Sequence, residues 1–151
     1  MIEKILKTIN EIYDIKATKI HEKVKGGYLT DNFIIGNDHE KYFFKKYRQG
    51  AAEHIDQIHA VKFFFSKNSI PAILPLENKN KKTYFIFENE CYCIFPFISG
   101  KTIGRSDLTQ KSMFSLGEIL AKMHLLSRDH FPKMIDKTTD GWNKDKFLLE
   151  A

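Results

Sequence analysis

The chain has 151 residues, 42% of them hydrophobic, and a net charge of +5. This length fits one domain, or one domain and part of a second, and the composition is typical of a globular protein and not of a disordered one. No apolar run approaches the ~18 residues that span a bilayer, and the N-terminus lacks the features of a signal peptide, so we expect a cytoplasmic protein.

The basic residues do not form a block. Of the 24 basic residues 21 are lysines, and they are scattered among 19 acidic residues. This distribution is typical of a solvated surface, although a basic balance also suits a nucleotide polyphosphate. A nucleic-acid-binding function depends on charge alone and is the least favoured.

The only two cysteines, Cys91 and Cys93, lie two residues apart in an apolar run. On a strand they would share a face, where a disulfide between them would be strained. No further metal ligand lies nearby in the sequence, so we expect reduced, half-buried thiols and no metal site.

Apolar periodicity and turn residues predict the elements in chain order. They are a helix over 2–13, strands over 17–25, 28–36 and 40–48, a helix over 51–67, a hairpin of strands 83–88 and 91–97 around Asn89-Glu90, a helix over 107–126 that Asp107 could cap, and a short helix over 143–150.

The strands therefore come in two groups that one helix separates. Because helices do not alternate with strands, a doubly wound parallel sheet is disfavoured. The pattern predicts an α+β fold, with a five-stranded antiparallel sheet and a packed helix. A boundary is expected near Gly100, because only helices follow it.

Three segments could carry chemistry. The turn at Gly26-Gly27 could bring backbone N–H groups to a phosphate, although such a turn is more often an ordinary hairpin. Strand alternation places Phe43 and Lys45 on one face, where the ring could stack on a base while the ammonium reaches its phosphates. The alternative is a core phenylalanine beside a solvated lysine. The third segment, CYCIFPFISG (91–100), is either a buried central strand or a strand whose end binds the edge of a heterocycle.

In this order the segments resemble the N-terminal lobe of the aminoglycoside phosphotransferase and choline kinase-like family of small-molecule kinases, which has a protein-kinase-like fold. The resemblance covers about residues 15–128. It rests on GGYLTDNFII (26–35), YFFKKYR (42–48), FFFSKNSIPAILPL (63–76), YCIFPFISGKTI (92–103) and SLGEILAKMH (115–124).

The resemblance implies ATP binding and assigns roles. Gly26 and Gly27 would lie over the phosphates, and Asn32 would brace that turn. Lys45 would contact the α- and β-phosphates, and Phe43 would stack on the adenine. The hinge 95–98 would bind the adenine edge, with Phe95 at its start, the carbonyl of Pro96 accepting from the amino group and the N–H of Ile98 donating to a ring nitrogen.

The resemblance also implies two units, an N-terminal lobe over 1–98 and the hinge with the start of a helical C-terminal lobe over 99–151. Such a protein phosphorylates a hydroxyl of a small metabolite or aminoglycoside-type acceptor, and no nucleic acid or membrane partner is expected. An exposed lobe interface would promote self-association.

Two features depart from the family pattern. The helix glutamate that normally pairs with the strand lysine would fall near Ile58 or His59, and neither is acidic. Glu53 lies one to two turns earlier and could serve only if the helix is shifted, whereas Gln57 or His59 could hydrogen-bond the lysine without neutralising it as well. The catalytic His-x-Asp-x-x-x-x-Asn loop and the Mg²⁺-binding aspartate find no counterpart, so no catalytic or metal residue is assigned. The expectation is a kinase fragment, inactive alone, from a cloned piece, a split gene or a shortened protein. The alternative is a non-catalytic nucleotide-binding or interaction module.

Overall fold

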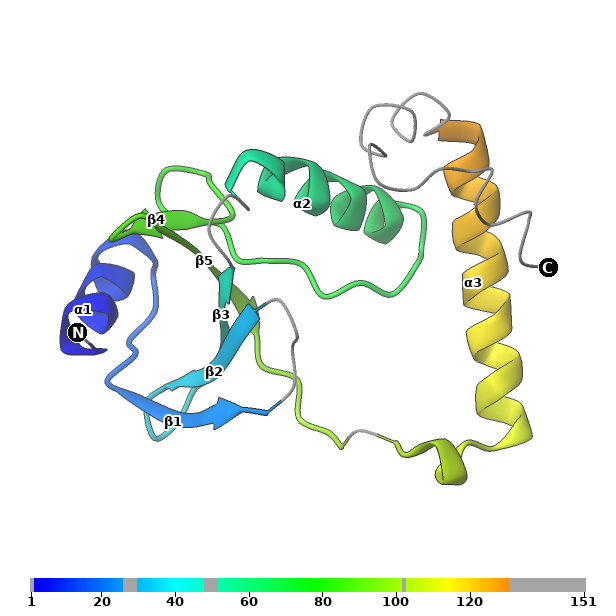
Figure 1. Ribbon diagram of the computed structural model, residues 1–151, viewed down its shortest axis with the longest axis horizontal. Helices are drawn as coiled ribbons and strands as arrows, with labels where there is room; N and C mark the ends of the chain where they lie inside the picture. Colours follow the sequence, from blue (N-terminus) through cyan, green and yellow to red (C-terminus); the bar gives the residue numbers. More distant parts are fainter. Residues whose placement is uncertain (1, 26–29, 48–51, 102, 131–151) are drawn as a thin grey trace, which may run out of the picture. The chain divides into compact units, whose positions relative to one another are not determined.

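The computed structural model describes residues 2–25, 30–47, 52–101 and 103–130 (Figure 1). The chain divides into two compact units, 1–101 and 102–151. The elements are α1 (Ile2–Ile12), β1 (Lys19–Val24), β2 (Thr30–Gly36), β3 (Lys41–Tyr47), α2 (Ala52–Lys67), β4 (Phe85–Phe87), β5 (Glu90–Pro96), a 3-10 turn η1 (Arg105–Asp107) and α3 (Gln110–His130).

The first unit is built on one five-stranded sheet. Its strand order is β1-β2-β3-β5-β4, and every neighbouring pair is antiparallel. The predicted α+β fold is therefore confirmed. Because β5 returns beside β3 after α2, the two groups of strands join in a single sheet.

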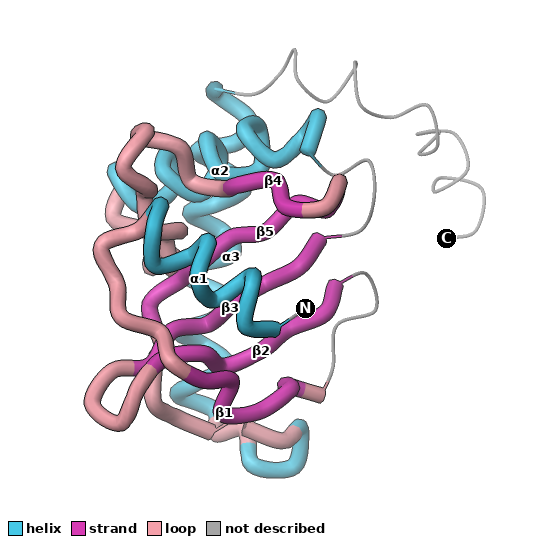
Figure 2. The backbone as a smooth tube through the Cα atoms, turned by 90° about the vertical axis from the view of Figure 1, so that its left-hand side faces the viewer, coloured by secondary structure: helices cyan, strands magenta, loops and turns pink. Residues whose placement is uncertain are grey.

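The two helices of this unit pack on opposite faces of the sheet (Figure 2). The face under α1 holds the larger cluster. There the helical spacing of Ile5, Ile9 and Tyr13 presents one apolar stripe to Phe44 and Ile94 of the central strands. The other face, called the α2 face below, carries Tyr47, Cys91, Cys93 and Phe95 against Ile55 of α2.

The turn between β2 and β3 needs a glycine. Gly36 has φ +152°, and a Cβ there would overlap the carbonyl oxygen of Glu40. The Asn37 side chain completes the turn, because its Oδ1 accepts from the backbone N–H groups of His39 (2.8 Å) and Glu40 (2.9 Å). The predicted turn at Asn37-Asp38 is thus present, with an asparagine that replaces missing backbone partners.

The β4–β5 hairpin turns one residue earlier than predicted. Its two loop residues are Glu88 (φ 49°) and Asn89 (φ 64°), and Phe87 pairs with Glu90. Two successive positive φ values are typical of the type I′ turn that matches strand twist. Glu90 is therefore the first residue of β5 and not part of the turn.

Apolar spacing predicts a buried stripe on α2 that includes Ile55 and Ile58, and the observed stripe differs from it. Ile58 is 42% exposed, whereas Ile55 and His59 are 0% and 1% exposed. The helical period is compatible with either stripe. The stripe with His59 packs on the sheet because the imidazole has polar contacts there with Thr83 and Cys93.

The second unit contains η1 and α3, and two details of the expected helix change. Asp107 belongs to η1 and does not cap α3. Thr109 caps it instead: the Ser112 N–H donates to Thr109 Oγ1 (3.1 Å), and the Thr109 N–H donates to Ser112 Oγ (2.9 Å). The expected helix over 143–150 lies outside the described residues. Within the described segments no helix is both long and apolar enough to cross a bilayer.

Candidate functional site

Cross-strand register arranges the α2 face in rows. Directly opposite residues of antiparallel strands point to the same side of the sheet. One row is Asn32, Lys45 and Cys93, across β2, β3 and β5. The next row towards the end of β5 is Ile34, Phe43 and Phe95. The predicted alternation is confirmed, because Phe43 packs with the α2-face cluster while Phe44 is buried on the α1 face.

The aromatic pair of this face is Phe43 and Phe95, which are directly opposite each other on β3 and β5. Phe95 is buried and Phe43 is partly buried against the same cluster. This arrangement places an apolar surface one row from the Lys45 side chain. A flat base needs such a surface, and a phosphate chain needs the cation beside it.

Lys45 is a half-buried cation on the same face. Its Nζ lies 4.7 Å from the ring centroid of Tyr47, a cation–π contact. Burial, and then the charge of Lys62, lower the pKa of Lys45 below its ordinary value. None of the ion pairs found among the described residues includes Lys45.

His59 is the α2 side chain that faces this row. Its Nδ1 lies 2.7 Å from Thr83 Oγ1, and its Nε2 lies 3.8 Å from Cys93 Sγ. Burial, and then the charge of Lys62, lower the pKa of His59 to about 4, with a smaller contribution from Lys45. The imidazole is therefore neutral at pH 7, so it supplies hydrogen bonds but no negative charge to balance Lys45.

The two thiols lie under the histidine. Cys91 and Cys93 are free and buried, and not half-buried as expected. The neighbouring Cys91 thiol, together with burial, raises the pKa of Cys93 above its ordinary value. Cys93 is thus protonated, and burial shields both thiols from reagents, as is typical of structural cysteines of the core. Among the described residues no three His, Cys, Asp or Glu side chains gather as metal ligands.

The remaining residues expected at the site lie around these rows. Asn32 is buried, and Thr30 Oγ1 donates to its Oδ1 (3.3 Å). Pro96 ends β5, and it is exposed, as is Ile98 in the segment that follows. Gly26 and Gly27 lie outside the described residues, so their place over this face stays a prediction.

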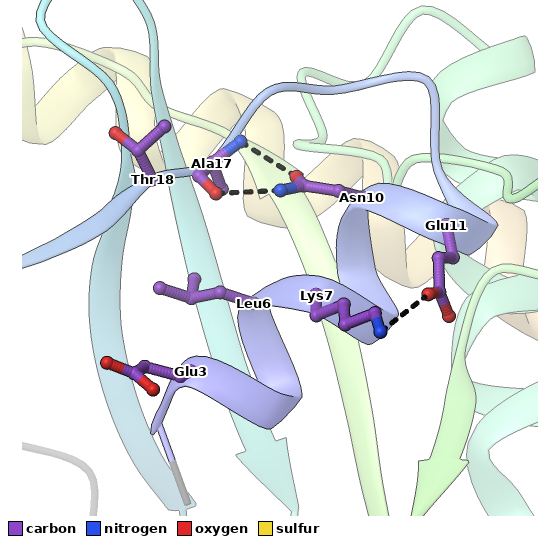
Figure 3. A pocket seen from close by; sticks show the side chains of 7 residues that line it. All are labelled: Glu3, Leu6, Lys7, Asn10, Glu11, Ala17 and Thr18. Atoms are coloured by element: carbon purple, nitrogen blue, oxygen red, sulfur yellow. Dashed lines mark hydrogen bonds and ion pairs between the residues drawn. The ribbon is translucent and has the colours of Figure 1, made fainter.

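A surface pocket lies elsewhere, between α1 and the start of β1 (Figure 3). Its floor is closed by Asn10, whose Nδ2 donates to the carbonyl of Ala17 and whose Oδ1 accepts from the Ala17 N–H, each at 2.8 Å. Both ends of the Asn10 amide are hydrogen-bonded to the backbone of Ala17. The charged side chains that line the pocket are therefore Glu3, Lys7 and Glu11.

Comparison with known proteins decides the family. A family model described as the phosphotransferase enzyme family, APH, matches residues 21–150. The chain belongs to the APH phosphotransferase family. The match begins within β1 and includes the Lys45 strand, α2, the hinge segment and α3, so the resemblance inferred from the sequence is confirmed.

Solved structures show the same fold for this APH-family chain. It matches spectinomycin phosphotransferase in complex with ADP and spectinomycin at 19% identity (TM-score 0.71), over 83% of this chain and 38% of that one. It also matches an amicoumacin kinase in complex with AMP-PNP, Ca²⁺ and Ami at 12% identity (TM-score 0.71), over 87% of this chain and 41% of that one. A microcompartment-associated aminopropanol kinase matches at 12% identity (TM-score 0.62), over 82% and 40%.

The APH-family chain thus spans about two fifths of the length of these structures. At such low identity the likeness shows the fold and not the site. No match was found among curated proteins.

The sequence predicts little about two residues of this face. For His59 it predicts only a possible hydrogen bond to the strand lysine in place of the expected acid, and it predicts no role for Lys62. Both follow Ile55 at helical spacing, on the stripe that faces the sheet. The spacing i, i+4, i+7 of Ile55, His59 and Lys62 indicates that the three share one helix face. Apolar periodicity does not reveal this, because two of the three residues are polar.

Proposed function

We propose that this chain is the nucleotide-binding part of an ATP-dependent small-molecule phosphotransferase. The observation that carries the proposal is the pair of adjacent rows on the α2 face, one with Lys45 and one with Phe43 and Phe95. Membership of a phosphotransferase family makes a nucleotide the natural ligand of an aromatic surface next to a half-buried cation.

In this proposal Phe43 stacks on the adenine and Lys45 contacts the α- and β-phosphates. The carbonyl of Pro96 and the N–H of Ile98 hold the edge of the base, next to Phe95. Gly26 and Gly27 cover the phosphates, with Asn32 as the brace of that turn. The nucleotides bound in two of the matched kinase structures, ADP and AMP-PNP, support ATP as the ligand.

The reaction is transfer of the γ-phosphoryl group of ATP to a hydroxyl of a small metabolite or an aminoglycoside-type acceptor. A new P–O ester bond forms, ADP leaves, and the hydroxyl proton passes to a base. The 151 residues contain no His-x-Asp-x-x-x-x-Asn motif to supply that base or to hold Mg²⁺. We therefore propose ATP binding without turnover for this chain, in the cytoplasm, where ATP is available.

The absence of that motif also favours a second candidate, a non-catalytic nucleotide-binding or interaction module. Both candidates require nucleotide binding and differ in whether any phosphoryl transfer occurs. An assay with ATP and aminoglycosides, choline or homoserine separates them. Turnover that persists after contaminating kinases have been excluded would contradict the inactive-fragment proposal.

Calorimetric titration with Mg-ATP tests the site. Lys45→Ala is expected to weaken binding by ~1–3 kcal/mol, the scale of a lost charge-assisted hydrogen bond. The matched control is Lys46→Ala, because Lys46 lies on the opposite face and its Nζ is 3.2 Å from Glu90 Oε1. Equal losses for both variants would contradict the assigned face. Steeply salt-dependent binding of duplex DNA without ATP binding would instead favour a nucleic-acid-binding function.

A further inference from the structure

The α2 face carries a second cation beside Lys45. Lys62 follows His59 by three residues on α2, and its Nζ lies 5.5 Å from the ring centroid of Phe95. The geometry brings the two lysines to one part of this face: Cys93, which is directly opposite Lys45, lies 3.8 Å from His59 Nε2, and Phe95, the ring under Lys62, follows Cys93 by two residues on β5. In agreement, the charge of Lys62 lowers the pKa of both Lys45 and His59. The imidazole itself is neutral at pH 7.

No ion pair of this pair of lysines is found among the side chains that the structure describes. None of the five ion pairs found there includes Lys45 or Lys62. Asp56, the one acid whose charge acts on His59, accepts instead a long hydrogen bond from the Tyr84 hydroxyl (3.5 Å). Aromatic rings are thus the observed partners of both ammonium groups. Two half-buried like charges without a counter-ion repel each other, and a bound anion would relieve that repulsion.

The two ammonium groups lie over rings from different rows of the sheet. Tyr47, the ring under Lys45, is opposite Cys91, and Phe95, the ring under Lys62, is four residues further along β5. At ~3.3 Å per residue the two ring positions are roughly 13 Å apart along the strand. The ammonium groups therefore suit different phosphates of one chain better than a single phosphate.

We infer that Lys62 and Lys45 form a two-cation site for a polyphosphate chain, in which Lys62 supplies a second phosphate contact from α2. The inference rests on the proposed function, because it extends the nucleotide site by one residue. It also explains why a neutral histidine is accommodated where the family resemblance implies a glutamate. Two cations on one face attract a polyanion more strongly than one does. Such a site therefore does not need an acid that orients the lysine.

The test titrates the full chain with orthophosphate, pyrophosphate and tripolyphosphate, without Mg²⁺ and without a base. Tripolyphosphate is expected to bind at least about tenfold more tightly than orthophosphate, since it reaches both cations. Lys62→Ala should weaken tripolyphosphate binding by about tenfold or more and remove this dependence on chain length. Lys62→Arg, which keeps the charge, should restore it, and circular dichroism checks that each variant is folded.

The matched control is Lys67→Ala, which removes an exposed lysine from the last turn of the same helix and should change binding less than about twofold. If Lys62→Ala binds tripolyphosphate like the wild type while Lys45→Ala does not, the two-cation site is wrong and the proposed function stands. Tripolyphosphate binding that needs both lysines, without any ATP binding, would support the two-cation site and overturn the proposed function. A wild-type chain that binds no tripolyphosphate overturns the inference.

Discussion

The Nδ1 atom of His59 lies 2.7 Å from the Oγ1 atom of Thr83, so a hydrogen bond joins α2 to the segment that leads into β4. The same ring stands edge-on to Phe95, with centroids 6.1 Å apart and planes at 90°. His59 is thus a neutral bridge between the helix and the sheet. The helix is held next to the Lys45 row by a group that must stay unprotonated.

This bridge predicts a pH dependence of stability. The folded-state pKa of His59 is about 4, below the ordinary value of 6.5, so protonation favours the unfolded chain. The full stability is present above pH 6.5 and declines as the pH falls towards 4, by up to ~1.4 kcal/mol per pH unit. Urea denaturation followed by circular dichroism between pH 4.5 and 7.5 measures this slope.

The variant His59→Gln should reduce the slope between pH 6.5 and 4.5, because glutamine does not titrate. His54→Gln is the matched control, since His54 is exposed on the same helix, and it should keep the wild-type slope. Equal slopes for the wild type and His59→Gln would show that the imidazole is not the group responsible.

In the β2–β3 turn, a single added methyl group should strongly reduce the stability of the chain. Gly36→Ala places a Cβ against the carbonyl oxygen of Glu40 at a φ of +152°, so the free energy of unfolding should fall by at least ~2 kcal/mol. Gly117→Ala is the control: no atom lies within 4 Å of its Cβ position in α3, and alanine should stabilise the helix by up to ~1 kcal/mol. Urea midpoints compare the two, and a neutral Gly36→Ala would refute the turn.

The clamp between Asn10 and Ala17 fixes α1 to the start of β1. Asn10→Ala removes two hydrogen bonds of 2.8 Å each and should cost ~1–3 kcal/mol of unfolding free energy. Asn10→Asp keeps the acceptor for the Ala17 N–H but places a carboxylate oxygen against the Ala17 carbonyl oxygen, so it should also destabilise the chain. Thr8→Ala removes an exposed bond to the Lys4 carbonyl in the same helix and should be almost silent in thermal denaturation.

The thiols offer a chemical measure of burial. Cys91 and Cys93 are 3% and 0% exposed, and the pKa of Cys93 is raised. Neither should react with Ellman's reagent in the native chain at pH 8, and both should react in denaturant. A thiol that reacts within seconds in the native chain would show that β5 is not buried beneath α2.

The exposed apolar side chains of the second unit lead us to expect self-association. Several large apolar side chains of this unit are exposed: Ile103, Leu108, Met113, Phe114, Leu116, Leu120 and Leu125. Exposed apolar surface of this extent promotes association in water. Light scattering coupled to size-exclusion chromatography should show a concentration-dependent mass, and Phe114→Lys, at a side chain that is 70% exposed, should lower it. A monomer at all concentrations would contradict this expectation.

The elements, their order and the side of the sheet to which each β3 residue points can be predicted from the amino-acid sequence alone. These properties are local: the period of 2 places Phe43 with Lys45 and opposite Phe44, and Gly36 with Asn37 specifies a turn. The family resemblance can also be recognised from the sequence, because it depends on segments in their order along the chain. The family match confirms it.

Which residues of α2 lie next to the lysine depends instead on how the helix packs on the sheet. The helical period fits two stripes, and apolar content favours the one with Ile58, which is exposed. His59 is buried because Thr83 and Cys93 supply its polar contacts, and both come from a hairpin that is distant in sequence. Lys45 and Lys62 also come together through packing. One lies on a strand and the other on a helix, so the spacing of residues along the chain does not reveal that they share a face.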